Sequence, residues 1–207
     1  MELHAGNGPL LVLLDDEETA RKLLPGLPEC SLLAFPAPDW DRDLTPWPAP
    51  GLGKGREDFG GGAEGFLAEL EKAVAEAEAS LPQAPEARAL MGYSLAGLFA
   101  LWAGTRTDTF GLLASVSGSL WYDGWGDYLA QHPCRAERVY LSLGEREPRA
   151  RNPRMARVGE ETERTERLLR ASGLETCLEW NPGGHFNDPE ARMLRAAAAL
   201  LGGFGKE

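Results

Sequence analysis

Ser94 has the neighbours that a nucleophilic serine needs. It lies between an apolar run that predicts a strand, residues 87–91, and an apolar run that predicts a helix, residues 95–103. A sharp turn that exposes a serine between two such elements has room only for small residues two positions before and after it. Gly92 and Ala96 occupy those positions, although the strict pattern has glycine where this chain has Ala96. We expect Ser94 to be a nucleophile; the alternative is a glycine-rich corner in which it only caps the helix.

A histidine that could take the proton from Ser94 follows the last predicted strand, residues 176–180. A serine hydroxyl is a poor nucleophile until a neighbouring base removes its proton. Of the three histidines, His4 lies near a frayed N-terminus and His132 precedes a proline, whereas His185 lies in a loop that contains two glycines. The order nucleophile, acid, base, with the base after the last strand, is the α/β-hydrolase arrangement. His185 is therefore the expected base; the alternative is an exposed, inert loop histidine.

Two carboxylates follow the preceding predicted strand, residues 139–143, where an acid that orients the base should lie. Either Glu145 or Glu147 could orient His185 and stabilise its imidazolium, while the other pairs with a neighbouring arginine. Pro148 restricts Glu147 to extended conformations, which would help to aim its side chain. We favour Glu147 and keep Glu145 as the alternative acid; a solvated charge cluster would give neither of them a role.

Backbone N–H groups could stabilise the oxyanion that forms when a serine attacks an ester. The N–H of Leu95 is expected at the start of the helix after Ser94, where the helix N-terminus favours negative charge. A second donor usually comes from the loop after an earlier strand, and residues 10–14 form such a strand. The Asp16 N–H is our candidate, although an acidic turn is electrostatically awkward beside an oxyanion.

Alternating apolar runs and amphipathic stretches must position these residues. Runs of four to eight apolar residues separated by helical patterns indicate a largely parallel sheet with crossover helices. We expect one α/β domain over residues 1–207, a doubly wound, mostly parallel sheet flanked by helices, without a large cap domain. The expected strands are 10–14, 30–35, 87–91, 111–116, 139–143 and 176–180, and the expected helices are 18–24, 63–80, 95–103, 160–171 and 189–201.

Residues 36–62 form a long stretch that we expect to be irregular. Loops of this length are uncommon in a compact domain and are often binding loops, so we expect this one to lie over the active site. Aromatic residues of loops at the carboxyl edge of the expected sheet could form an apolar wall for a substrate; they are Trp40, Trp47, Trp121, Tyr122 and Trp125. Tyr93 is a further candidate for substrate binding. The alternative for these aromatic residues is core packing. Ser117 and Ser119 lack the small-residue turn, and we interpret both as structural.

The composition excludes several classes of partner. The 207 residues are 43% hydrophobic and 26% charged, and their net charge of −11 would repel nucleic acid and anionic membrane surfaces. No run approaches the ~18 apolar residues of a membrane span, and the N-terminus has no leader pattern. Three scattered cysteines fit a reducing compartment. We expect a cytoplasmic protein, and leave a homodimer open.

Several segments together resemble a known family over most of the chain. They are Asp39-Trp40, residues 44–50 (Leu-Thr-Pro-Trp-Pro-Ala-Pro), residues 92–99 (Gly-Tyr-Ser-Leu-Ala-Gly-Leu-Phe), residues 117–121 (Ser-Gly-Ser-Leu-Trp) and residues 181–186 (Asn-Pro-Gly-Gly-His-Phe). In these segments the chain resembles the α/β-hydrolase esterases of the esterase D and siderophore (enterochelin) esterase type. The resemblance implies a serine hydrolase that acts on small-molecule esters without a metal or organic cofactor, with Ser94 as nucleophile and His185 as base.

The resemblance also bears on the acid and on rival functions. Related esterases tend to carry the acid three residues after a glycine that ends its strand, which here points to Glu147. Many relatives have aspartate there, and some siderophore esterases resemble a serine-histidine dyad. The expected function is hydrolysis of a small or siderophore-like ester through an acyl-enzyme. The alternatives are an acyltransferase on the same scaffold and a non-catalytic binding module.

Overall fold

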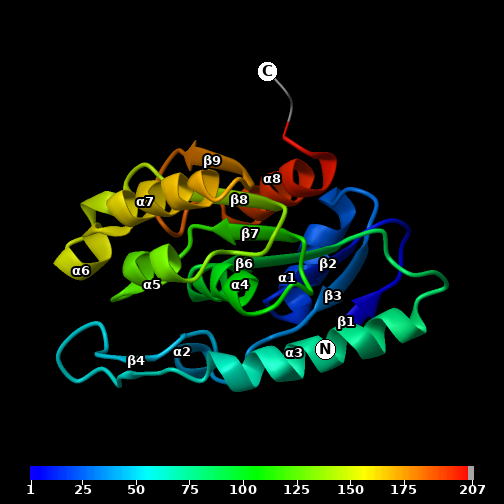
Figure 1. Ribbon diagram of the computed structural model, residues 1–207, viewed down its shortest axis with the longest axis horizontal. Coiled ribbons are helices and arrows are strands. Elements are labelled where there is room, and N and C mark those ends of the chain that lie inside the picture. The colour runs from blue at the N-terminus through cyan, green and yellow to red at the C-terminus, as the bar shows by residue number, and fades with distance from the viewer. Residues whose placement is uncertain (205–207) are drawn as a thin grey trace.

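Seven strands form one sheet in the computed structural model, which describes residues 1–204 (Figure 1). The strand order is β1-β3-β2-β6-β7-β8-β9, and every pair is parallel except β1 with β3. The strands are β1 (Glu2–His4), β2 (Leu10–Leu13), β3 (Ser31–Ala34), β6 (Arg88–Tyr93), β7 (Leu112–Val116), β8 (Arg138–Gly144) and β9 (Glu175–Asn181). The doubly wound, mostly parallel sheet predicted from the sequence is confirmed.

Alternate residues of each central strand supply two separate cores. In β2, Leu10 and Val12 pack into one core, whereas Leu11 and Leu13 pack into the other. All four side chains are fully buried. A parallel strand is covered on both faces, so it appears in the sequence as a continuous apolar run rather than an alternating one. This is why the central strands could be located from the sequence.

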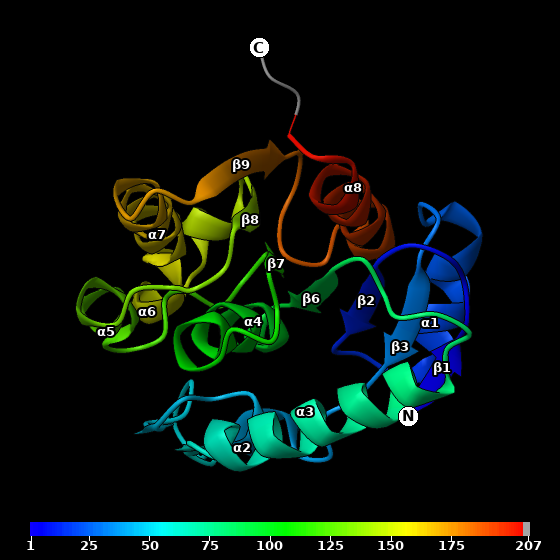
Figure 2. The same cartoon turned by 45° about the vertical axis from the view of Figure 1, so that its right-hand side comes forward.

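Helices cover both faces of the sheet. The helices are α1 (Glu17–Leu23), α2 (Trp40–Asp43), α3 (Ala63–Ser80), α4 (Leu95–Arg106), α5 (Trp125–Gln131), α6 (Pro153–Ala156), α7 (Val158–Ala171) and α8 (Pro189–Gly202), with short 3₁₀ turns η1 (Leu24–Gly26) and η2 (Glu147–Arg149). Residues of α1 and α8 share one core, and residues of α3, α4, α5 and α7 share the other. Figure 2 shows α8 on one side of the sheet and α4, α5 and α7 on the other. Within residues 1–204 no helix is both long and apolar enough to cross a bilayer.

Two expectations about local structure were wrong. The N-terminus is not frayed at His4, because Glu2–His4 pairs antiparallel with β3 and extends the sheet by one edge strand. The segment 36–62 is not wholly irregular: it contains α2 and a two-stranded hairpin of β4 (Pro48–Ala49) and β5 (Phe59–Gly60). Short elements of this kind depend on tertiary partners rather than on their own apolar pattern, so periodicity does not reveal them.

Candidate active site

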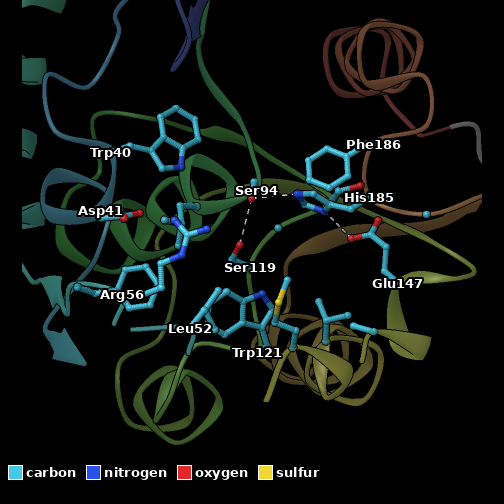
Figure 3. Close-up of a pocket in the computed structure, with 18 of the residues that line it drawn as sticks. Trp40, Asp41, Leu52, Arg56, Ser94, Ser119, Trp121, Glu147, His185 and Phe186 are labelled. Carbon is cyan, nitrogen blue, oxygen red and sulfur yellow. Dashed lines mark hydrogen bonds and ion pairs between the residues drawn. The ribbon is translucent and has the colours of Figure 1, made fainter. Parts of the chain in front are cut away.

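The predicted nucleophile, acid and base follow three different strands and meet at one edge of the sheet (Figure 3). Ser94 follows β6, Glu147 follows β8 and His185 follows β9. These strands are parallel, so their carboxyl ends share an edge, which is where open α/β sheets bind ligands. The strand order therefore brings together side chains that are up to 91 positions apart in the sequence.

Ser94 occupies a strained turn between β6 and α4. Its backbone has φ +59° and ψ −122°, a conformation that residues other than glycine rarely adopt. A side chain at Gly92 would place its Cβ 2.3 Å from the carbonyl of Ala96, so only glycine fits there. Gly97 is similarly restricted, because a Cβ there would lie 2.8 Å from Ser115 Oγ. Ala96 itself is accommodated at the position where the strict pattern has glycine.

A continuous hydrogen-bond relay joins the three side chains. The Ser94 hydroxyl lies 3.1 Å from Nε2 of His185, and Nδ1 of His185 lies 2.7 Å from Oε2 of Glu147. With the proton of the neutral imidazole on Nδ1, the ring donates to the carboxylate and Nε2 accepts from the serine. This arrangement can transfer the serine proton to the ring. Glu145, the alternative acid, is exposed and lies outside the cavity wall.

The environment of Glu147 keeps its carboxylate ionised. Its side chain is only 5% exposed, and burial alone would raise the pKa. Hydrogen bonds from the His185 ring and from the Gly144 N–H, which lies 2.7 Å from Oε1, outweigh burial and lower the pKa below its usual 4.5. Glu147 is therefore ionised at neutral pH.

Hydrogen bonds to its backbone groups hold the loop that carries His185. Gly183 has φ +91°, and the N–H of Gly184 donates to the side chain of Asn187 at 2.8 Å. The Tyr93 hydroxyl donates to the carbonyl oxygen of His185. Tyr93 was expected to contact substrate, but it lies outside the cavity wall because its hydroxyl is turned toward this loop. Its contact fixes the position of His185 instead.

Sequence reasoning missed Arg192, which lies behind Glu147. This side chain of α8 is 1% exposed, and its Nη1 lies 3.2 Å from Oε1 of Glu147. The pattern of residues 189–201 predicts a helix but assigns none of its residues to the site. A usable signal existed, since Arg192, Ala196 and Leu200 are four residues apart and therefore lie on one helix face. An arginine in register with buried apolar residues indicates a buried partner.

The loop after β7 also reaches the nucleophile. The Ser119 hydroxyl lies 3.3 Å from the Ser94 hydroxyl and faces the cavity, and its N–H donates to the Ser94 carbonyl at 2.9 Å. Ser119 is interpreted as structural from the sequence because no small-residue turn surrounds it, but the structure places its hydroxyl beside Ser94. Its placement depends on β7 being the neighbour of β6, which a local motif does not encode.

The two predicted oxyanion donors differ in their placement. Leu95 is the first residue of α4, where a helical N–H has no intrahelical partner, and it lines the cavity. Asp16 does not reach the cavity. Its N–H donates to Asp15 Oδ1 at 2.8 Å, and its carboxylate caps α1 by accepting from Thr19. The acidic turn after β2 therefore satisfies itself and starts a helix instead of facing Ser94.

A cavity of about 980 Å³ opens over Ser94. Trp40 and Trp121 line it as expected. Trp47 does not, because its indole donates to the Asp123 carbonyl and its ring packs against that of Tyr128 with centroids 5.0 Å apart. Tyr122 and Trp125 do not line it either, because both are buried in the core. Phe186, which we did not predict, lines the cavity although it is 90% exposed. In Figure 3, Trp40 and Phe186 lie on opposite sides of Ser94. The segment 36–62 contributes part of the cavity wall, as expected, through Trp40, Asp41, Leu52, Gly55, Arg56, Glu57 and Phe59.

Comparison with protein families supports the resemblance noted in the sequence. The model of a family described as "Putative esterase" matches residues 32–188. A curated relative, the uncharacterized protein YbbA of Bacillus subtilis strain 168, is 26% identical over 166 residues. The match covers 76% of this chain and 66% of YbbA, so the chain spans just under two thirds of that relative.

Solved structures share the fold. The siderophore hydrolase EstA from Aspergillus nidulans matches with a TM-score of 0.71 and 20% identity, over 96% of this chain and 83% of EstA. The enterobactin esterase FES from Shigella flexneri matches with a TM-score of 0.70 and 19% identity, over 96% of this chain and 54% of FES. At these identities the likeness is one of fold.

Proposed function

Because this chain belongs to the esterase family, we propose that it is a serine esterase in which Ser94, His185 and Glu147 form the catalytic triad. The observation that carries the proposal is the relay from the Ser94 hydroxyl through both ring nitrogens of His185 to Glu147. Each group faces the partner that its role requires, and the relay borders a cavity large enough for a small-molecule ester.

The reaction would proceed through an acyl-enzyme. Ser94 Oγ attacks the ester carbonyl carbon while its proton passes to Nε2 of His185, and Glu147 stabilises the resulting imidazolium. The Leu95 N–H, at the N-terminus of α4, donates to the oxyanion. When the tetrahedral intermediate collapses, the carbon–oxygen bond to the alcohol breaks, and His185 returns its proton to the departing oxygen. A water molecule, activated by His185, then hydrolyses the acyl-enzyme by the same two steps.

The walls of the cavity suggest the kind of ester that binds. Trp40, Trp121 and Phe186 give apolar surface beside Ser94, and Ser119 adds a hydroxyl. A volume of about 980 Å³ accommodates a substrate larger than an acetate ester. Two proteins of the same fold are named as a siderophore hydrolase and an enterobactin esterase. We propose a siderophore-like ester, or a small ester with a bulky apolar group, as the substrate.

The proposal is tested by labelling with a fluorophosphonate probe and by turnover of p-nitrophenyl esters of graded acyl length. Ser94→Ala should lose labelling and lower kcat by about 10³-fold or more, with an unchanged circular dichroism spectrum. Ser119→Ala is the matched control, because it removes a second hydroxyl from the same cavity and should retain labelling. Activity of Ser94→Ala within a few-fold of wild type would refute the assignment.

An added alcohol distinguishes hydrolysis from acyl transfer. Water and an alcohol compete for the same acyl-enzyme, so the ratio of acid to new ester measures the preference. We expect the free acid to dominate. A product that is mainly the new ester would make the chain an acyltransferase, with the same triad.

A further inference from the structure

Arg192 connects three loops of the candidate site from behind. Its Nη1 donates to Glu147 at 3.2 Å and to the Ser117 hydroxyl at 2.8 Å. Its Nη2 donates to the carbonyls of Pro182 and Gly184, at 3.0 and 2.9 Å. One guanidinium thus holds the loop of the acid, the loop of the base and the loop after β7.

The burial of this arginine is costly and therefore informative. At 1% exposure, the guanidinium has exchanged water for these four protein acceptors, and only Glu147 among them is charged. Buried ion pairs are often no more stable than a well-packed apolar pair of similar size. Stability alone is therefore a weak reason to place a cation here, and its position against the acid points to a role in the chemistry.

We propose that Arg192 is a positioning residue of the esterase site, which holds Glu147 and the His185 loop and biases His185 toward its neutral, proton-accepting form. This inference rests on the proposed function. The two oxygens of Glu147 are divided: Oε2 accepts from His185, and Oε1 accepts from Arg192 and the Gly144 N–H. The carboxylate would by itself favour the imidazolium, and a cation on its far oxygen offsets part of that effect.

The other charged and titratable groups around His185 do not duplicate this arrangement. Tyr93 on β6 donates to the His185 carbonyl and packs against the His185 ring with centroids 5.4 Å apart, but burial raises the pKa of its hydroxyl, so it brings no charge to the ring. The same cavity is lined by Arg146 and Arg149 from the acid loop, both exposed, and by charged residues of the segment 36–62, which are Asp41, Arg56 and Glu57. Solvent screens exposed charges far more than a buried pair. Arg192 is the buried cation in contact with the relay.

The test is a pH titration of His185 in wild type and in variants of Arg192. Nuclear magnetic resonance follows the imidazole directly, and a His185→Gln sample identifies its signals among the three histidines. We expect the midpoint in R192M and R192Q to lie about half a pH unit or more above that of wild type, because the offsetting cation is gone. R192K keeps a cation and should return the midpoint toward wild type.

The kinetics should show the same displacement. The acid limb of kcat/KM moves to higher pH in R192M and R192Q. On the alkaline plateau kcat falls about tenfold or more with little change in KM, because substrate binding is untouched while Glu147 and the His185 loop are no longer held. A lysine lacks the planar fork that reaches both carbonyls, so R192K should keep the limb but recover only part of kcat.

Equal midpoints in wild type and in a folded neutral variant would overturn the proposal and leave Arg192 a purely structural residue. If urea denaturation shows that neither neutral variant is folded, the midpoint of His185 in E147Q/R192Q is compared with its midpoint in E147Q. The double variant should then titrate at the higher pH, and equal midpoints would again refute the role. Because the resonance titration needs no turnover, its result is independent of the Ser94→Ala test of the proposed function.

Discussion

At the scale of single residues, Glu147 and Glu145 differ in what their carboxylates meet. Glu147 is buried and receives the His185 ring at 2.7 Å, whereas Glu145 faces solvent. An orienting carboxylate holds the imidazole tautomer and stabilises its charged form, so its loss lowers kcat more than it raises KM. We expect Glu147→Gln to lower kcat by at least ~10²-fold and the matched control Glu145→Gln by less than ~10-fold, in steady-state assays with one p-nitrophenyl ester.

The opposite order of these two effects would assign the acid to Glu145. Small effects of both would indicate a dyad of Ser94 and His185, with the imidazole held by other groups. Circular dichroism of each variant separates a lost acid from a lost fold.

Phe186 is a large apolar residue that is almost fully exposed, so it contributes little to the core. Its ring is 90% exposed, lines the cavity and meets His185 edge-on with centroids 5.0 Å apart. We expect Phe186→Ala to raise KM about three- to tenfold for esters with bulky apolar acyl groups and to leave the acetate ester unchanged, because only the former reach the ring.

Trp180→Ala provides the control for this prediction. Trp180 is also an exposed aromatic residue, at 37%, but it lies on β9 outside the cavity wall. A KM change that is the same for all acyl lengths, or the same in both variants, would exclude a substrate contact at Phe186.

At the scale of elements, the turn between β6 and α4 has no space for a side chain at Gly92. The built Cβ would lie 2.3 Å from the Ala96 backbone, so the strand and helix would have to separate. We expect Gly92→Ala to lower the free energy of unfolding by about 2 kcal/mol or more, as overpacking does, and to abolish probe labelling of Ser94. Urea denaturation measures the first effect, and gel fluorescence the second.

The same substitution at Gly65 should change the free energy of unfolding in the opposite direction. Gly65 lies in the first turns of α3, is exposed, and has no atom within 4 Å of its built Cβ. Gly65→Ala should therefore raise the free energy of unfolding by about 0.5–1 kcal/mol. If Gly65→Ala destabilises the chain as much as Gly92→Ala does, the loss at Gly92 is not specific to the crowded turn.

The elements that could be predicted are those with their own sequence signal. Residues 10–14 form a continuous apolar run because both faces of β2 are buried, and Gly92 and Ala96 mark a turn whose crowding is local. Edge strand β1 has no such signal, since Glu2 and His4 are polar and their pairing is set by β3. Trp40 and Trp47 look alike in sequence, and the packing around the β4–β5 hairpin decides which of them reaches the cavity.

At the scale of the whole molecule, the ionised Glu147 links stability to pH. Its native pKa is lower than the 4.5 of an unperturbed glutamate, so its stabilising contribution is fully present above about 4.5 and is lost as the pH falls through the lower native value. We expect wild type to be more stable than Glu147→Gln near pH 6, and the difference to shrink near pH 3, in urea denaturation at both pH values. A difference that is constant between these pH values would mean that the ionised form is not the one stabilised.

The positions of Ser94, Glu147 and His185 along the chain also have a temporal consequence. The nucleophile and the base are 91 residues apart, so at about 5–20 residues per second a ribosome adds His185 roughly 5–18 s after Ser94. Helix α8, with Arg192, follows the base. If the proposed triad is correct, a nascent chain carries Ser94 for seconds before the base that would activate it has been added. Under the proposed function, hydrolytic competence arises only after His185 and α8 have been added, so the time at which a probe first labels Ser94 reports when these later segments have joined the fold.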